Sequence, residues 1–571
     1  MSNEFQTIRN QVMWDRLINV VEEQARTMMR VAFSAVVREA GDLSAGVFNP
    51  KGELLAQAVT GTPGHINSMA RSVKHFMEVI PPDTMKPGDA YITNDPWKST
   101  GHLFDFTVVT PTFHDGRLVA FFSCTAHVAD IGGNGPDPNS RDVFAEGLFI
   151  PIMPLCVEGE MNGWFINLLR ANSREPDKLE GDVYALVACN ETGADRLTRM
   201  MDEYGMDDLD ALSACILETS DRTMREAIAK LPRGEWSSTL RIDGFDEPLD
   251  LATTLRIDGE YIDIDFAGTS PVSKYGVNCP MYYTDAYTSF GVKCLVAPHL
   301  ANNAAVLARI RIAAPEGCIV NAPFPSPVTA RAVIGQMLPD AAFNCFAMAM
   351  PDAVPASGTG ASWSLRVAGG PGVTGDVGRK ATSFMSQNFQ SGGMGGHPRH
   401  DGMSATAFPS GVKAIAIEVV EAMTPLVFWK RALRADSGGA GKFRGGLGQS
   451  VEVENREDAA FALFALFQCM KYPAGGRNGG NDGATGTLDL RSGAPINGRG
   501  RQIIPAGDRL FVEMPGGGGF GDPHRRDPAA VLKDVVNGYV SAEKAREVYR
   551  VAIMLDNTVD EAATRALRAA G

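Results

Sequence analysis

The fold of the N-terminal part is decided by two β-rich runs on either side of a turn signal, DFTVVTPTFHDGRLVAFFSCTAH (residues 105–127). We expect an antiparallel hairpin whose loop is the three residues 114–116, with the loop glycine in the left-handed conformation. This loop length pairs Phe113 with Arg117. The pairing of every other residue in the hairpin follows from that register.

The predicted register creates one polar face on the hairpin. It places Asp105 opposite Thr125 and diagonal to His127 on the same face, with backbones about 7–8 Å apart. Because side chains alternate along a strand, the phenylalanines and valines between them lie on the other face. His102 lies three residues before Asp105, and Gly101 permits a bend that would bring the histidine to the pair.

Two histidines with one or two carboxylates and no thiolate are typical ligands of a borderline or hard divalent ion such as Zn²⁺, Mn²⁺ or Fe²⁺. An open position on such an ion could hold a water of lowered pKa, so the site could serve hydrolysis or the stabilisation of an enolate. The alternative is structural: His102 caps a strand and His127 is a hydrogen-bonded core histidine. Spacing alone leaves both interpretations open.

Outward from the hairpin, hydrophobic periodicity alternates between helical and strand patterns. Residues 5–40 are predicted to be helical, and Asp42 follows them, where the helix gives way to a second hairpin around the turn NPKG at 49–52.

The fold class is therefore α+β and multi-domain, with mixed β-sheets, an N-terminal helical segment and Gly-rich loops. We expect three domains: a metal-binding region (1–232), a central mixed α/β region (233–410) and a C-terminal β-rich region with a helical tail (411–571).

Composition excludes several classes of protein. The 571 residues carry a formal net charge of -14, without the basic surplus that binding to nucleic acid or an anionic membrane favours. We find no signal peptide and no run of 18 apolar residues, so a cytoplasmic location is expected. The nine cysteines are scattered without a C-x-x-C pair, which argues against a zinc knuckle, an iron–sulfur cluster or a disulfide framework.

Two Gly-rich segments superficially resemble nucleotide-binding motifs. PGGGGFGDP (515–523) contains G-x-G-x-x-G, but an Asp-Pro pair follows where a dinucleotide-binding helix should begin. GGAGKFRGGLG (438–448) lacks the first glycine and the Ser or Thr of a P-loop. Both are therefore predicted to be loops, and neither predicts ATP binding by this chain.

Three signatures in order resemble one family over essentially the whole chain: GDAYITNDPWKSTGHLFDFTVVTPTF with TAHVADIGG, then DSGGAGKFRGGLGQ, then PGGGGFGDPHRRDPAAVLKDVVNGYVSAEKAREVYRV. The sequence closely resembles the hydantoinase B family. That family includes B subunits of ATP-dependent hydantoinases and lactamases, the C-terminal part of 5-oxoprolinase, and subunits of acetone and acetophenone carboxylases. The resemblance implies a metal held by an H-x-x-D element, a later histidine and an acidic residue after the first helix. The matching residues are His102, Asp105, His127 and Asp42.

The resemblance also implies a division of labour. A separate partner of the hydantoinase A type binds ATP and phosphorylates the substrate's carbonyl oxygen, and this chain opens the activated cyclic amide within a hetero-oligomer such as a heterotetramer. Asp130 is a candidate general base beside His127. Two alternatives stay open: a subunit of an ATP-dependent ketone carboxylase, and a non-catalytic subunit whose metal is structural. One departure from the family pattern is Trp97 with KST at 98–100, where a tyrosine and glycines are usual.

Overall fold

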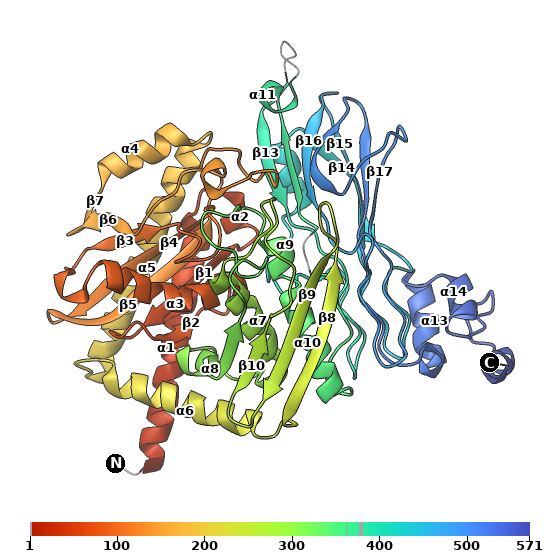
Figure 1. Ribbon diagram of the computed structural model, residues 1–571, viewed down its shortest axis with the longest axis horizontal. Coiled ribbons are helices and arrows are strands. Elements are labelled where there is room, and N and C mark those ends of the chain that lie inside the picture. Colours follow the sequence, from red (N-terminus) through yellow and green to blue (C-terminus); the bar gives the residue numbers. More distant parts are fainter. Residues whose placement is uncertain (1–2, 361–362, 376–380, 571) are drawn as a thin grey trace. The chain divides into compact units, whose positions relative to one another are not determined.

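The computed structural model describes residues 3–360, 363–375 and 381–570 (Figure 1). Contacts within the chain divide it into two compact units. The first comprises residues 1–237, 252–342 and 411–413, and the second residues 238–251, 343–410 and 414–571. The predicted α+β class with mixed sheets is confirmed, whereas the division into three domains stays a prediction.

The first unit is built around a seven-stranded antiparallel sheet in the order β2-β1-β5-β4-β3-β6-β7. Its two longest strands form the predicted central hairpin. The strands are β1 (Leu43–Phe48), β2 (Leu54–Gln57), β3 (Ala90–Thr93), β4 (Asp105–His114), β5 (Arg117–His127), β6 (Met153–Val157) and β7 (Glu160–Met161).

Helices cover both faces of this sheet. The N-terminal helix α1 buries Leu17, Val21, Ala25 and Met28, whose spacing of three or four residues produces one apolar stripe. It packs with α5 against one face, while α3 lies against the other with α7 (Figure 1). The helices are α1 (Asn3–Val31), α2 (Ala35–Arg38), α3 (Pro63–Val79), α4 (Gly163–Asn172), α5 (Pro176–Tyr204), α6 (Asp210–Ile228), α7 (Met281–Val296), α8 (Ala304–Ala308) and α9 (Ala332–Gly335), with 3-10 turns η1 (Pro82–Thr84) and η2 (Val143–Ala145).

A four-stranded sheet follows the helical region in the order β11-β10-β9-β8. It is mixed, because β10 pairs parallel to β11 and antiparallel to β9. Its strands are β8 (Gly234–Ile242), β9 (Leu249–Ile257), β10 (Ile262–Asp265) and β11 (Ile310–Ala313), and the helix α10 (Leu338–Ala349) comes later in the chain.

The second unit contains two four-stranded sheets, β13-β12-β16-β18 and β14-β15-β19-β17, and ends in the predicted helical tail. The strands are β12 (Leu365–Gly369), β13 (Phe384–Asn388), β14 (Leu426–Leu433), β15 (Gln449–Asn455), β16 (Phe461–Leu466), β17 (Thr487–Leu490), β18 (Arg499–Ile504) and β19 (Arg509–Glu513). The helices are α11 (Pro371–Thr374), α12 (Ile417–Met423), α13 (Pro528–Val536), α14 (Ala542–Glu547) and α15 (Glu561–Ala569), with the 3-10 turn η3 (Pro523–Arg525).

A glycine bundle, which we define as residues 392–396, 438–448, 474–483 and 515–521, lies within the second unit. Its segments bond to one another through backbone groups: Gly446 donates to Met394, Gly517 to Gly446, and Gly439 to Gly517, at 2.7, 3.0 and 2.8 Å. A Cβ placed on Gly517 would lie 2.1 Å from the Met394 carbonyl oxygen. These glycines are therefore required by the close approach of neighbouring backbones, and the motifs that resembled nucleotide loops belong to this bundle.

Within the described residues, no helix combines the length and apolar character needed to cross a bilayer. All nine cysteines are free thiols and seven are buried, as expected from their scattered spacing.

Candidate metal centre

The β4–β5 hairpin places Asp105 and His127 side by side. The two residues are direct cross-strand partners, as are Thr107 and Thr125, so the predicted polar face is confirmed. The predicted register was wrong by two residues. The loop has two residues, Asp115 and Gly116, both with positive φ as a type I′ turn requires, and a β-bulge follows it on β5.

The observed register brings the Asp105 and His127 side chains closer together than the predicted register does. Residues directly opposite each other on one face have Cβ atoms about 4.5–5.5 Å apart, whereas diagonal neighbours are more distant. The ring of Phe104 stacks on the His127 ring, with centroids 5.5 Å apart and an interplanar angle of 13°. His127 is therefore held between its strand partner and an aromatic ring.

His102 joins the pair through the bend predicted at Gly101, where φ is +92°. No residue with a side chain fits at position 101, because its Cβ would lie 2.8 Å from the Arg331 side chain and 2.9 Å from that of Tyr283. The bend brings His102 Nε2 to 2.8 Å from Asp105 Oδ1. Among the described residues, His102, Asp105 and His127 form the group of buried ligand atoms that lie within 4.8 Å of one another.

The Asp105 carboxylate is shared between two sets of partners. Its Oδ1 faces His102 Nε2 at 2.8 Å and His127 Nδ1 at 3.1 Å. Its Oδ2 faces His65 Nε2 at 3.0 Å and the Arg331 guanidinium at 2.5 Å. Burial alone would raise the pKa of Asp105, but the His65 imidazole and the charge of Arg331 hold it well below its usual range. Asp105 is therefore ionised.

The His102 imidazole is neutral, which is the form in which a histidine can bind a metal. Its Nδ1 lies 3.1 Å from the Thr329 carbonyl oxygen, which can only accept, so the ring proton is on Nδ1 and the Nε2 lone pair faces Asp105. Burial, and after it the charge of Arg331, lower the pKa of His102 to about 3. The buried Nε2 has no hydrogen-bond partner within the described part of the chain.

A divalent cation fits this arrangement. A neutral nitrogen lone pair and a carboxylate oxygen at 2.8 Å repel each other unless a cation or a proton lies between them. Four tetrahedral ligands at about 2.0–2.1 Å from an ion lie roughly 3.3 Å from one another, close to the 2.8 and 3.1 Å found here. A carbonyl that accepts from the other ring nitrogen is the usual way a metal-binding histidine is oriented.

Asp42 lies beside this group, at the junction of helix and hairpin where the sequence placed it. Its carbonyl oxygen accepts from the His127 N–H at 3.2 Å. Its Oδ1 accepts from the Thr62 hydroxyl at 3.1 Å and lies 3.7 Å from His65 Nε2. Asp42 is not part of the tightest ligand group, and its role as a fourth ligand stays a prediction.

Sequence reasoning missed His65 and Arg331. His65 lies in the first turn of α3, bridges the Asp42 and Asp105 carboxylates, and is 3% exposed. Burial opposes its protonation, but the charges of Asp105 and Asp42 outweigh that effect and raise its pKa. His65 lies at the start of a predictable amphipathic helix, among residues that the helix buries, and a histidine there could have been recognised as a candidate site residue. Arg331 is 226 residues from Asp105 in the chain and left no local pattern.

Asp130, the candidate base, is buried but faces other partners. Its Oδ2 accepts from the Arg174 N–H at 2.5 Å and its Oδ1 lies 3.1 Å from the Arg174 guanidinium. The Ser173 hydroxyl also donates to it. Asp95, by contrast, accepts from the Trp97 N–H at 2.9 Å and is the turn-forming residue of the loop before His102.

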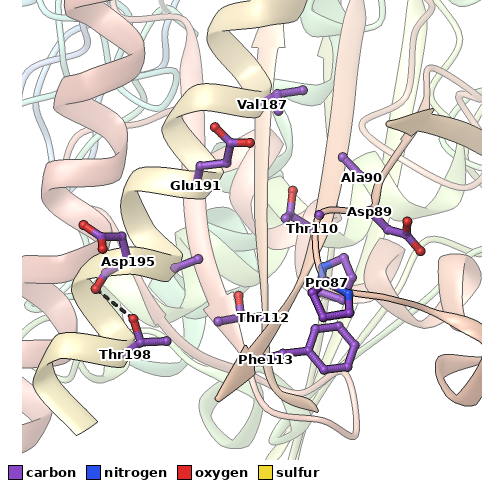
Figure 2. A pocket seen from close by; sticks show the side chains of 13 residues that line it. Pro87, Asp89, Ala90, Thr110, Thr112, Phe113, Val187, Glu191, Asp195 and Thr198 are labelled. Atoms are coloured by element: carbon purple, nitrogen blue, oxygen red, sulfur yellow. Dashed lines mark hydrogen bonds between the residues drawn. The ribbon is translucent and has the colours of Figure 1, made fainter. Parts of the chain in front are cut away.

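A pocket of about 250 Å³ lies between β4 and α5 (Figure 2). This is the face of the seven-stranded sheet that points away from Asp105. It is lined by Thr110 and Thr112 of β4 and by Glu191 and Asp195 of α5. Thr110 alternates with Val109, which shares the face of Asp105, so the sheet separates this pocket from the candidate metal centre.

Comparison with known proteins gives concordant results. The sequence profile of the family described as Hydantoinase B/oxoprolinase matches residues 6–523. A putative D-/L-hydantoinase B subunit from Pseudomonas sp. (strain NS671) is 29% identical, over 98% of this chain and 97% of its own. The crystal structure of ATP-dependent caprolactamase from Pseudomonas jessenii superimposes with a TM-score of 0.89 at 27% identity, over 99% of both chains. Nucleotide-free acetone carboxylase shares the fold, with a TM-score of 0.86 at 20% identity over 99% of this chain and 83% of its own.

Proposed function

The chain belongs to the hydantoinase B/oxoprolinase family, and from that premise we propose that it is the metal-bearing subunit of an ATP-dependent cyclic-amide hydrolase. The observation that carries this proposal is the unpartnered, neutral Nε2 of His102 facing the ionised carboxylate of Asp105. A purely structural cluster would direct a proton donor of His102, and not a nitrogen lone pair, at that oxygen.

The proposed ligands are His102, Asp105 and His127, with Asp42 as a further oxygen ligand. A divalent ion at this site, Zn²⁺, Mn²⁺ or Fe²⁺, would supply Lewis-acid activation of water and of the substrate's carbon–oxygen bond. The chain's own contribution is orientation. Thr329 holds the tautomer of His102, while Arg331 and His65 hold the second oxygen of Asp105 so that the first remains directed at the histidines.

We propose that ATP is bound by a hydantoinase A-type partner in a hetero-oligomer such as a heterotetramer. The partner transfers a phosphoryl group to the carbonyl oxygen of a lactam, hydantoin or 5-oxoproline ring. At this chain a water adds to the activated carbon, the ring C–N bond breaks and the nitrogen takes a proton. A second water releases phosphate from the resulting acyl phosphate. The balance is one cyclic amide, one ATP and two waters giving the ring-opened acid, ADP and phosphate.

Asp130 remains the proposed general base. To accept a proton it would have to release Arg174, which contacts both of its oxygens. An Arg174→Ala variant separates the two roles of this carboxylate. If the pair is only structural, the variant loses stability without a change in the pH dependence of turnover, whereas a base freed from its ion pair would shift that dependence.

The test is to co-express the chain with an A-type partner and measure ATP turnover against hydantoins, 5-oxoproline and larger lactams, before and after chelation. We expect ring opening that is lost in metal-free protein and in His127→Ala. His114→Ala is the matched control, because His114 lies at the turn end of β4 in the same hairpin and its imidazole faces the exposed carboxylates of Asp115 and Asp202. Full activity of metal-free protein would contradict the proposal.

A ketone carboxylase subunit is the second candidate, favoured by the fold shared with acetone carboxylase. It predicts ATP turnover on small ketones that depends on bicarbonate, which is measured by adding small ketones, with and without bicarbonate, to the same assay. A non-catalytic metal subunit predicts instead that chelation lowers the melting temperature while ligand substitutions leave activity intact.

A further inference from the structure

A buried carboxyl outside the ligand group organises the loop beside it. Glu146 follows η2, and its side chain is 0% exposed. Its Oε1 accepts two consecutive backbone N–H groups, those of Val328 at 2.6 Å and Thr329 at 2.8 Å. Backbone donors in the interior need partners, so this oxygen fixes the positions of the Val328 and Thr329 amides.

The loop held by Glu146 makes two contacts with the candidate metal centre. The carbonyl of Thr329 accepts from His102 Nδ1 at 3.1 Å. Two residues later, Arg331 pairs with Asp105 and also donates to the Thr100 carbonyl at 2.7 Å. The same short segment thus orients one nitrogen ligand and one oxygen ligand.

We propose that Glu146 is a positioning residue for the metal centre, acting through the Val328–Arg331 segment. This inference rests on the proposed function. Other bonds, from Ala330 N–H to the Gly276 carbonyl at 2.6 Å and from Asn278 to the Pro327 carbonyl at 2.9 Å, tie the segment elsewhere. Loss of Glu146 therefore displaces the Thr329 carbonyl without releasing the whole loop.

Glutamine is the closest mimic of this side chain. Burial, opposed by the two backbone hydrogen bonds, raises the pKa of Glu146 to about 8, so the carboxyl is neutral at pH 7. A Glu146→Gln variant keeps the accepting oxygen without adding or removing charge. Glu146→Ala removes the accepting oxygen. Glu146→Asp keeps a carboxyl group, but its side chain is one methylene group shorter, so the oxygen lies farther from the Val328 and Thr329 amides.

Asp182 provides a matched control in the same unit. It is also 0% exposed, and its Oδ1 accepts the consecutive backbone N–H groups of Phe33 and Ser34 at 2.8 and 3.1 Å. Those residues contact none of the three clustered ligands in the described structure. Asp182→Ala therefore reproduces the loss of a buried acceptor without its effect on His102.

The experiment titrates Zn²⁺ and, for its visible spectrum, Co²⁺ into the full-length metal-free chain, with no partner or substrate, alongside melting curves. Loss of an outer partner of a metal ligand typically weakens metal affinity by about 10–100-fold. We expect that loss and an altered Co²⁺ spectrum for Glu146→Ala, a smaller loss for Glu146→Asp, and wild-type affinity for Glu146→Gln and Asp182→Ala. If Glu146→Ala does not fold, Glu146→Asp carries the test.

Two results would overturn the inference, and they have different consequences for the proposed function. If the wild-type chain binds metal and both Glu146→Ala and Glu146→Asp bind it equally well, Glu146 does not position the site and the proposed function is untouched. If the wild-type chain binds neither ion, the proposed metal centre fails and the inference fails with it.

Discussion

Replacing Asp105 with asparagine distinguishes a cluster built for a metal from one built only for its own ion pairs. Asp105 is fully buried and its partner Arg331 is 3% exposed. In metal-free protein the substitution leaves the Arg331 charge without its carboxylate. Breaking one side of a buried pair costs about 3–5 kcal/mol of the free energy of unfolding. An ion-pair role alone predicts this loss, with or without metal.

A metal-binding role predicts an additional loss that appears only with metal present. Metal at about 1000 times its Kd stabilises the wild-type fold by about 4.1 kcal/mol. If Asp105→Asn weakens binding by about 100-fold, the same concentration stabilises the variant by about 1.4 kcal/mol. The difference between the two proteins therefore widens by about 2.7 kcal/mol when metal is added.

Urea unfolding with and without Zn²⁺ or Mn²⁺ measures this difference. Asp243→Asn is the control, since Asp243 is a buried carboxylate that accepts from the Met470 N–H and lies 3.8 Å from Arg499, in the second unit. Its cost should be the same with and without metal. A difference between Asp105→Asn and wild type that stays constant on adding metal would refute the assignment of Asp105 as a ligand.

Three further outcomes are expected. His65→Leu should lower metal affinity by less than Asp105→Asn, because His65 contacts the Asp42 and Asp105 carboxylates, which are proposed ligands, without belonging to the tightest group; equal losses in a Zn²⁺ titration would instead make it a ligand. Because the pKa of Glu146 rises from its ordinary 4.5 to about 8 in the folded protein, the folded state keeps a proton that the unfolded chain releases. The free energy of unfolding should then fall by up to about 1.4 kcal/mol per pH unit between those values, and Glu146→Gln should flatten that slope in urea melts across pH. Gly517→Ala should destabilise the protein by about 3 kcal/mol or more in a thermal melt, since its Cβ would meet a backbone oxygen at 2.1 Å, whereas Gly372→Ala, with open space around it, should be nearly neutral.

Local patterns were sufficient for much of the fold and for the core of the site. Strand alternation placed Asp105 and His127 on one face, and helical periodicity placed α1. The hairpin register could not be derived, because a bulge on β5 opposite Thr112 and Phe113 and a two-residue loop together move the pairing by two residues. The same sequence is compatible with a two- or a three-residue loop and with a bulged or a regular strand. Tertiary packing selects among these registers.

Contacts between distant parts of the chain could not be derived at all. Arg331, Thr329 and Glu146 reach the site from segments far from the hairpin, and none belongs to a recognisable motif. A buried arginine is stable only when its charge is paired. The sequence contains no periodic signal for such a pair, so these residues became visible only once the fold brought the loops together.

The glycine bundle has a thermodynamic consequence for the second unit. Its segments are held by backbone hydrogen bonds, and at many of its glycines a Cβ would meet the backbone of a neighbouring segment and not a side chain. The heat-capacity increment and the denaturant m-value of unfolding both scale with the surface exposed, and the increment rises chiefly with apolar surface. Unfolding of this bundle should therefore show a small heat-capacity increment per residue. Its stability should depend only weakly on temperature near the maximum, unlike that of the helix-covered sheet of the first unit.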